Sequence, residues 1–283
     1  MLTVKARILS CSLSREDKMR PWPYIQGSVR WAWSPFLRYL HTMTNNKPPL
    51  VLIPGLMCDD AVWTPMLPWL EEVASPHLID HGLANSLTTM AEQVLDKVKG
   101  SFLMAGHSMG GRVAMEVMRL APERMLGVAL MDTGHKPLAQ GEKGLEERQK
   151  RQVLLDLAKT SGVRAMASEW VKGMVAPSRL SDAALIEDIL VMFERKSADI
   201  FERQIQALLA RPDGGLALAQ ASCPVALICG EMDAWSPVSQ HEEMSALLKG
   251  QPTVQVVKGA GHMCTMESPM AVASEMLKWI EHC

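Results

Sequence analysis

The chain has 283 residues, of which 48% are hydrophobic and 21% charged, and its formal net charge is −2. This composition is typical of a folded globular protein with a sizeable core, and it excludes a mainly disordered chain. The sequence has no uninterrupted apolar run long enough to cross a membrane, and its six cysteines are too scattered for a disulfide framework. We therefore expect no membrane span, reduced thiols and a cytoplasmic location.

Residues 1–43 differ in charge from the rest of the chain. They carry seven basic and two acidic side chains, whereas residues 44–283 carry 22 basic and 29 acidic ones, a net charge of −7. The segment fits three interpretations: native strands, a targeting leader, or an extension that precedes a natural start at Met43. Because the acidic body offers no basic stripe, we expect no nucleic-acid partner.

From residue 49 onward, short apolar runs alternate with helical patterns. Six runs predict strands, at 49–53, 77–80, 101–105, 126–131, 224–229 and 253–257. Helices are predicted at 60–70, 90–98 and 109–121 and after residue 268. Pro65 and Pro68 must distort the first helix, and Thr89 with Glu92 has the spacing of a capping box at the second. The alternation indicates an α/β fold, with a mostly parallel sheet that helices cover on both faces.

Residues 135–215 interrupt this alternation. They contain four amphipathic helical stretches, at 146–158, 163–174, 185–193 and 200–209, and no convincing strand. Their charged side chains nearly cancel, which is typical of a solvated helical insertion. Ligands bind at the carboxyl ends of the strands in such sheets, so we expect the insertion to cap that edge. The predicted organisation is one α/β domain over 44–283 with an all-helical cap at about 135–215.

The sequence Gly106-His107-Ser108-Met109-Gly110 joins a predicted strand to a predicted helix. This is a G-x-S-x-G pattern in a strand–turn–helix setting, where a sharp turn exposes the serine at the end of the sheet. Glycines at positions 106 and 110 remove side chains that would collide with the strained turn. The amino-terminal end of the helix favours negative charge that develops beside the serine. The pattern therefore predicts Ser108 as a nucleophile.

A serine hydroxyl needs a base, and the base needs an acid that orients it. His262 follows the last predicted strand in a Gly-Ala-Gly-His sequence, and Asp233 follows the strand before it. Both positions lie at the carboxyl ends of strands, the edge that presents Ser108. Glu231 and Asp132, the latter after the fourth predicted strand, are alternatives for the acid.

The charge on a tetrahedral intermediate needs two hydrogen-bond donors, which are commonly backbone amides. Met109 directly follows the predicted nucleophile, and Leu56 lies in the loop after the first predicted strand. We expect their amides to form an oxyanion hole. No metal site is expected, because His77 and His81 lack the glutamate of an HExxH motif and lie on a predicted strand.

Four segments carry a resemblance to a known family: PLVLIPG, GHSMGG, PVALICGEMD and GAGHM. Over roughly residues 49–283 the chain resembles the α/β-hydrolase superfamily, and it is most similar to the small carboxylesterase and enol-lactonase-like branch with a helical cap. The resemblance implies a triad of Ser108, His262 and Asp233 and no cofactor. Two features depart from the family. Pro54-Gly55 stands where His-Gly is usual, and the first two strands of the family have no counterpart unless residues 1–43 provide them.

A serine at this position predicts acyl transfer through an acyl-enzyme, with water activated by His262. The expected partner is a small-molecule ester or lactone with a small or medium apolar acyl group, because methionines adapt to varied apolar ligands. The candidate pocket residues are Met57, Met174, Met192, Met232 and Met263. A thioesterase, C–C bond hydrolase or acyltransferase with the same triad is the first alternative, and a non-catalytic ligand-binding homologue is the second. The sequence carries no signal for oligomeric state.

Overall fold

The computed structural model describes residues 47–283. The three interpretations of residues 1–43, including the strands that the segment was expected to provide, therefore lie outside the described residues. None of the helices within 47–283 is both long and apolar enough to span a bilayer.

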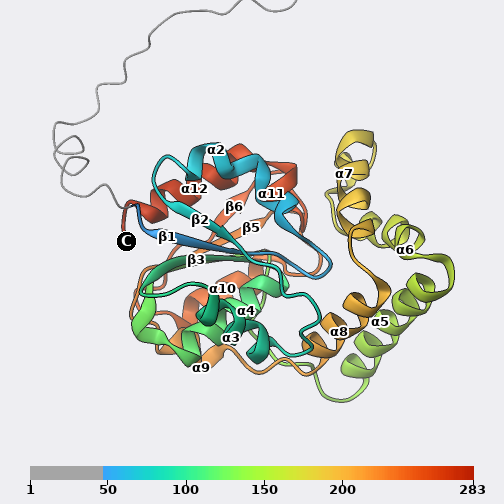
Figure 1. Cartoon of the computed structure of the whole chain (residues 1–283), viewed down its shortest axis with the longest axis horizontal. Coiled ribbons are helices and arrows are strands. Elements are labelled where there is room, and N and C mark those ends of the chain that lie inside the picture. The colour runs from blue at the N-terminus through green and yellow to red at the C-terminus, as the bar shows by residue number, and fades with distance from the viewer. Residues whose placement is uncertain (1–46) are drawn as a thin grey trace, which may run out of the picture. The chain divides into compact units, whose positions relative to one another are not determined.

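A parallel six-stranded sheet forms the centre of the fold (Figure 1). Its strands in chain order are β1 (Pro49–Ile53), β2 (Ser75–Leu78), β3 (Phe102–His107), β4 (Met125–Met131), β5 (Val225–Gly230) and β6 (Gln255–Val257). Their order across the sheet is β2-β1-β3-β4-β5-β6, and every neighbouring pair is parallel. All six predicted strands are present, with boundaries that differ from the prediction by at most two residues, and the α/β fold class is confirmed.

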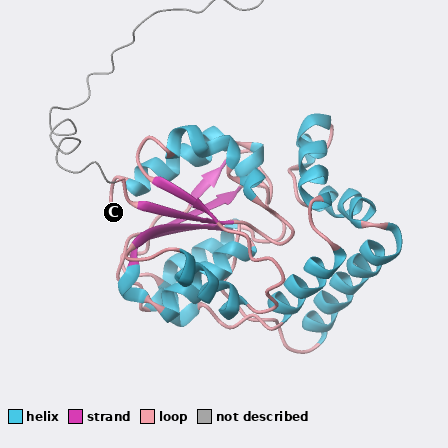
Figure 2. Ribbon diagram, viewed as in Figure 1, coloured by secondary structure: helices cyan, strands magenta, loops and turns pink. Residues whose placement is uncertain are grey.

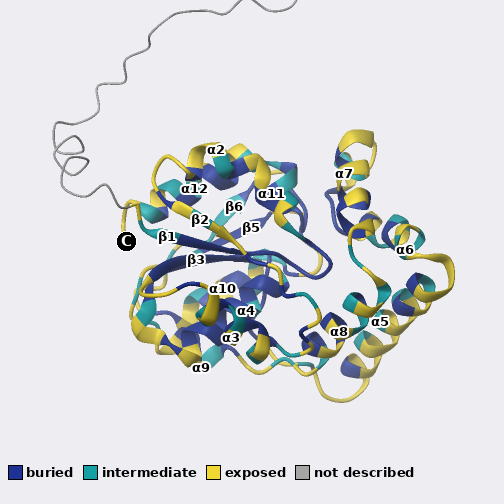
Figure 3. Ribbon diagram, viewed as in Figure 1, coloured by how far each residue is buried: buried dark blue, intermediate teal, exposed yellow. Residues whose placement is uncertain are grey.

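Helices cover both faces of the sheet (Figures 1 and 2). On one face lie α2 (Leu67–Leu70), α11 (Cys264–Glu267) and α12 (Pro269–Ile280). On the other lie α3 (Leu87–Lys97), α4 (Met109–Leu120), α9 (Gly215–Ala219) and α10 (Val238–Leu247). With both faces covered, β3 is buried throughout (Figure 3), and β4 is buried except at Leu126. This explains their continuous apolar sequence.

Two local details differ from the sequence-based expectation. The predicted helix at 60–70 is divided into the 3₁₀ turns η1 (Asp60–Val62) and η2 (Thr64–Met66) and the short helix α2. The division follows from its two prolines, which remove backbone donors. The helix α3 is capped by Ser86, whose hydroxyl accepts from the Thr89 amide, so the predicted capping box was wrong. Ser86 lies one turn before Thr89, the residue predicted to cap the helix, and its hydroxyl bonds a free amide in the first turn.

The segment between β4 and β5 forms a helical insertion beside the sheet (Figures 1 and 2). Its main helices are α5 (Glu142–Ser161), α6 (Val163–Trp170), α7 (Ala183–Glu194) and α8 (Ala198–Leu209), with the 3₁₀ turns η4 (Val171–Gly173) and η5 (Pro177–Arg179). The insertion has its own apolar interior, which includes Met166, Ile189, Met192, Phe193 and Phe201. Because this interior packs against the main core, the insertion can hold a fixed surface over the strand ends.

Candidate active site

A strained turn presents Ser108 between β3 and α4. Its backbone has φ 54° and ψ −115°, a conformation that non-glycine residues rarely adopt. The turn is held by hydrogen bonds from the Ser108 amide to the Met131 carbonyl (2.8 Å) and from the Thr133 hydroxyl to the Ser108 carbonyl (2.7 Å). The surrounding structure therefore holds the serine in this conformation.

Two glycines make the turn sterically possible. A β-carbon at Gly106 would overlap the backbone of Gly110, and one at Gly110 would overlap the carbonyl of Ile53 in β1. We predicted from the sequence that side chains here would collide with the serine turn, whereas the atoms closest to a β-carbon belong to the backbones of Gly110 and Ile53. The glycines thus allow α4 to start against the sheet, with no room for a side chain.

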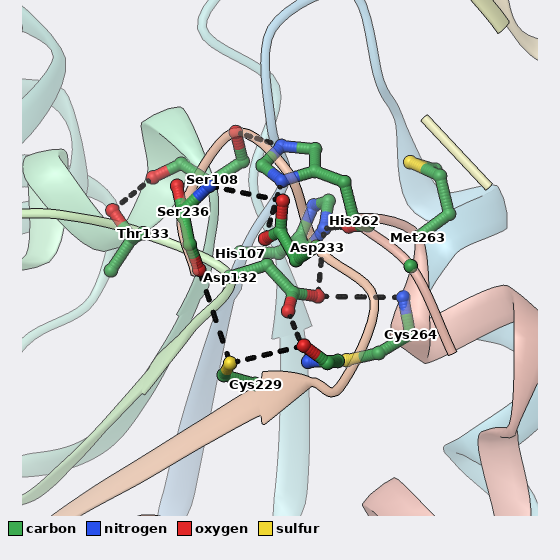
Figure 4. A network of polar contacts seen from close by, with 12 residues as sticks. His107, Ser108, Asp132, Thr133, Cys229, Asp233, Ser236, His262, Met263 and Cys264 are labelled. Carbon is green, nitrogen blue, oxygen red and sulfur yellow. Dashed lines mark hydrogen bonds and ion pairs between the residues drawn. The ribbon is translucent and has the colours of Figure 1, made fainter. Parts of the chain in front are cut away.

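Ser108, His262 and Asp233 form a continuous hydrogen-bonded chain (Figure 4). The Ser108 Oγ lies 2.8 Å from His262 Nε2, and His262 Nδ1 lies 2.8 Å from Asp233 Oδ2. The other carboxylate oxygen of Asp233 accepts from the amides of Trp235 (2.9 Å) and Ser236 (3.0 Å). The loops after β3, β5 and β6 thus bring together three groups that can pass a proton from hydroxyl to imidazole.

The electrostatics of the pair support this proton path. Burial alone would lower the pKa of His262, but the adjacent Asp233 outweighs burial, and the pKa lies above its ordinary value of 6.5. Burial would likewise raise the pKa of Asp233, but the charge and hydrogen bond of His262 and the two amide donors lower it. Asp233 is therefore a carboxylate at neutral pH, and it stabilises the imidazolium that forms when His262 takes a proton.

The two alternative acids have other partners. Asp132 accepts hydrogen bonds from the amides of Gly230 (2.8 Å) and Cys264 (3.4 Å), and burial, followed by the charge of Asp233, raises its pKa to about 7. Glu231 pairs with Lys258 at the surface. Neither acid is hydrogen bonded to the His262 ring in the described part of the chain. Asp132 instead ties the end of β5 to the loop that carries His262.

Buried polar groups fix the backbone around His262. The His107 ring lies 2.8 Å from the His262 carbonyl through its Nε2, and burial lowers its pKa to about 4, so the ring is neutral and donates through this nitrogen. The Glu267 carboxylate accepts from the amides of Ala176 (2.8 Å), Gly261 (2.9 Å) and Met263 (3.2 Å). Glu267 therefore joins the His262 loop to the cap segment.

The two residues expected to supply the oxyanion donors lie in the same cavity lining as Ser108. Leu56 and Met109 both line the cavity beside Ser108, and within residues 47–283 neither amide has a protein acceptor. The next amide along the loop, that of Met57, donates to the Gln204 Oε1 of α8 at 2.8 Å. Both expected donors are thus available for a bound oxygen atom, while the cap holds the adjoining peptide.

A cavity of about 550 Å³ lies between the sheet edge and the cap, and Ser108 and His262 line it. Its apolar wall includes Leu154, Trp170, Met174, Phe201, Leu208 and Trp235. The Trp235 ring lies 4.8 Å from the His262 ring, centroid to centroid, and stacks on Trp170 at 5.7 Å. The Trp235 indole therefore covers the imidazole on this side, and Trp170 packs against Trp235. Trp235 follows β5 and Trp170 belongs to the cap helix α6, so no local sequence pattern indicates that the two indoles stack beside His262.

The five methionines proposed for the pocket lie in three different settings. Met174 and Met263 line the cavity. Met57 and Met192 are fully buried and lie outside its lining, and Met232 is 50% exposed and also outside it. Apolar side chains in a strand-end loop or a cap helix can face the core, the cavity or solvent, and the sequence does not distinguish these directions.

The cavity lining also contains charged side chains that were not predicted from the sequence. Five basic side chains contribute to it, from α4, α5 and the residues after α8: Arg112, Lys143, Lys150, Arg151 and Arg211. The acidic side chains of the lining are Asp132, Glu146 and Glu147. In sequence these charges look like the solvated face of a helix. Among residues 47–283, no group of three or more histidine, cysteine or acidic side chains is placed to hold a metal ion.

The sequence matches the Alpha/beta hydrolase family over residues 27–275, and the chain belongs to this family. The chain is similar to the biotin biosynthesis bifunctional protein BioHC of Cellvibrio japonicus, at 24% identity over 245 residues, 83% of this chain and 48% of that protein. It therefore spans about half the length of that relative. It is also similar to the pimeloyl-[acyl-carrier protein] methyl ester esterase of Photobacterium profundum, at 27% identity over 78% of this chain and 89% of that one.

A solved structure shares the fold. The thermophilic esterase of Thermogutta terrifontis superimposes with a TM-score of 0.76 at 23% identity, over 85% of this chain and 92% of the esterase. At this identity the likeness defines the fold. The α/β-hydrolase fold with its helical insertion is thereby established for this chain, and the predicted family resemblance is confirmed.

Proposed function

We propose that this α/β hydrolase is a serine-dependent hydrolase of carboxylic esters. The observation that carries the proposal is the hydrogen-bonded chain from Ser108 through His262 to Asp233 at the wall of the cavity between the sheet edge and the cap. An activated hydroxyl needs this combination of base and orienting acid, and each contact measures 2.8 Å. The similarity to an esterase from Photobacterium profundum supports the same reaction class.

The proposed reaction begins when the Ser108 Oγ attacks the ester carbonyl carbon and His262 Nε2 accepts the hydroxyl proton. The carbonyl oxygen becomes an oxyanion that the amides of Leu56 and Met109 stabilise, and one such donor is typically worth about 3 kcal/mol. The intermediate collapses, the bond to the alcohol breaks, and His262 returns its proton to the leaving alcohol. Throughout this step, Asp233 stabilises the imidazolium.

In the second half of the proposed reaction, water attacks the acyl group on Ser108. His262 accepts a proton from this water and later returns it to the serine, which releases the acid product. A small or medium apolar chain fits beside Trp170, Trp235 and Met263 on the apolar wall of the cavity. Because that wall is made of large flexible or aromatic side chains, we expect loose selectivity for chain length.

Labelling with a fluorophosphonate tests the nucleophile. We expect the wild type to be labelled, Ser108→Ala to lose all labelling, and Ser236→Ala to keep it. Ser236 is the matched control because it lines the same cavity without contacting the His262 ring in the described structure. A folded wild type that is not labelled would favour a non-catalytic ligand-binding protein.

Turnover assays test the reaction class. Carboxylic esters and thioesters with matched acyl chains are compared by their kcat/KM, and we expect the oxygen esters to be preferred. A clear preference for thioesters, with Ser108 still labelled, would replace the ester-hydrolase proposal by a thioesterase with the same three residues.

A further inference from the structure

The charge of the cavity is opposite in sign to that of the body around it. Residues 44–283 have a net charge of −7, yet the cavity lining holds five basic and three acidic side chains. Of the acids, Asp132 is engaged by two backbone amides. Glu147 is engaged by two arginines. A concave surface of one sign within a protein of the other sign concentrates ligands of opposite charge.

The arginines of the lining compete for few acceptors. Both carboxylate oxygens of Glu147 are taken by Arg211, at 2.8 Å each, and Arg151 adds a contact of 2.9 Å to one of them. The Lys136 carbonyl accepts from Arg211 Nε (3.2 Å) and Arg112 Nη1 (2.8 Å). Arg211 also donates to the Leu208 carbonyl (2.8 Å), so the three guanidinium groups have one carboxylate and two carbonyls as protein acceptors in the described structure.

Arg112 has the fewest protein partners of the three. Its Nε and Nη2 have no acceptor among residues 47–283, and its partly buried side chain lines the cavity. Burial, followed by the charge of Arg211, lowers the pKa of Arg112 to about 9, so the group is charged at neutral pH. The nearby Glu147 carboxylate is bonded to Arg211 and Arg151, and Arg112 has no direct ion pair among residues 47–283. It lies one helical turn after Ser108 on α4, within the same cavity.

We propose that Arg112, supported by Arg211 and the lysines at 143 and 150, binds a carboxylate on the substrate, which is therefore the half-ester of a dicarboxylic acid. The inference rests on the proposed ester hydrolysis and adds the substrate class. The planar guanidinium presents parallel donors that match the two oxygens of a carboxylate. The apolar wall takes the methylene chain between that carboxylate and the scissile ester.

The test compares matched methyl esters: monomethyl adipate against methyl hexanoate, with succinate and suberate half-esters for chain length. We expect wild type to prefer the charged ester in kcat/KM. Arg112→Gln reduces this preference by about 10- to 100-fold, the usual effect of losing a hydrogen bond to a charged group. Arg112→Lys retains part of it. Arg148→Gln, an exposed position of α5 outside the cavity lining, is the matched control and keeps the full preference.

Protection against labelling gives a second readout that does not depend on turnover. Adipate should slow fluorophosphonate labelling of Ser108 more than hexanoate does in wild type, and equally in Arg112→Gln. The anion site is overturned if adipate and hexanoate slow labelling equally in wild type, or if wild type prefers methyl hexanoate as a substrate. Either result leaves the proposed hydrolase intact. Loss of labelling in the wild type itself overturns the proposed function instead.

A different contact supports a second inference, which also rests on the proposed reaction. Gln204 of α8 is buried, and its Oε1 accepts from the Met57 amide at 2.8 Å. Met57 has φ 63°, a strained value for a side chain of this type, and it directly follows Leu56. We infer that Gln204 is a positioning residue through which the cap holds the oxyanion loop.

The variant Gln204→Met removes the acceptor while it keeps a side chain of similar length. We expect kcat to fall about tenfold with KM little changed, which is less than the loss of a whole oxyanion donor. Gln204→Glu, which keeps an acceptor oxygen, should restore part of kcat. Gln206→Met, exposed on the same helix, is the control. A lower melting temperature in Gln204→Met with unchanged kcat would show a purely structural role and overturn the inference.

Discussion

The edge of the sheet and the cap are built by different physical means. At the sheet edge, Ser108, Asp233 and His262 follow strands whose positions are fixed by backbone pairing in a buried parallel sheet. The cap is joined to these loops by individual contacts, such as Gln204 to the Met57 amide. It is also joined by the His262 amide, which donates to the Met174 carbonyl at 2.7 Å.

This difference separates two properties of the proposed enzyme. The proton path depends on Ser108, His262 and Asp233, whereas the size and charge of the substrate depend on the cavity lining, to which the cap, α4 and the strand-end loops all contribute. Variants in the hydrogen-bonded chain should therefore reduce the rate with every ester, and variants in the rest of the lining should alter the choice among esters.

The largest difference is expected between the two buried aspartates. Asp233→Asn should lower kcat about 10⁴-fold, because the amide no longer stabilises the imidazolium and can favour the wrong ring tautomer. Asp132→Asn should lower kcat by about tenfold or less, since Asp132 only orders neighbouring loops. Steady-state kinetics with one neutral ester measures both. Equal losses would contradict the assignment of Asp233 as the acid.

Substitution of Glu267 tests how the His262 loop is joined to the cap. Glu267→Gln should lower the free energy of unfolding by about 1–3 kcal/mol, because its amide group cannot accept hydrogen bonds from all three backbone donors. Urea unfolding measures this change, and kcat should fall with it because the His262 loop loses its anchor. Glu169→Gln, which removes a surface contact to Lys172, is the control and should be nearly neutral. An unfolding curve of Glu267→Gln identical to the control would contradict the proposed anchor.

The pH profile tests the electrostatics of the edge. His262 must be neutral to accept a proton, so kcat/KM should fall as the pH decreases through its pKa, which Asp233 holds above 6.5. In Asp233→Asn the carboxylate that raises the pKa of His262 is absent. The fall in the residual kcat/KM should therefore occur at a lower pH than in wild type. An acid limb at the same pH in both proteins would show that another group controls it.

The smallest effects are expected at two methionines that the sequence does not distinguish. Met263→Ala should raise KM for esters with apolar chains by about three- to tenfold, since the side chain is buried at the cavity wall. Met232→Ala should change KM by less than about twofold, because the side chain is half exposed and lies outside the lining. Similar KM values for the two variants would show that the apolar wall does not bind the chain.

Features that depend on residues close together in the sequence were predictable, whereas features that depend on distant residues were not. The strand–turn–helix around Ser108 was predictable because its glycines and apolar strand lie within a few residues. The helix α10 was not predicted, since only His241 and Met244 are buried on it and it has no apolar stripe. The basic side chains of α5 have the charge pattern of a solvated helix, and the sequence does not distinguish that surface from a cavity wall.

By itself, the sequence determined the alternation of strands and helices, the turn at Ser108 and the order of the candidate residues along the chain, because each depends on neighbours in sequence. Only the tertiary structure decided that Asp233 and not Asp132 contacts His262, and that Arg112 and the tryptophans share a cavity with Ser108. The contact between Ser108 and His262 likewise joins positions 154 apart, and such contacts are set by the packing of the sheet, its end loops and the cap. The periodic pattern of apolar residues along a sequence does not show which distant segments will contact each other.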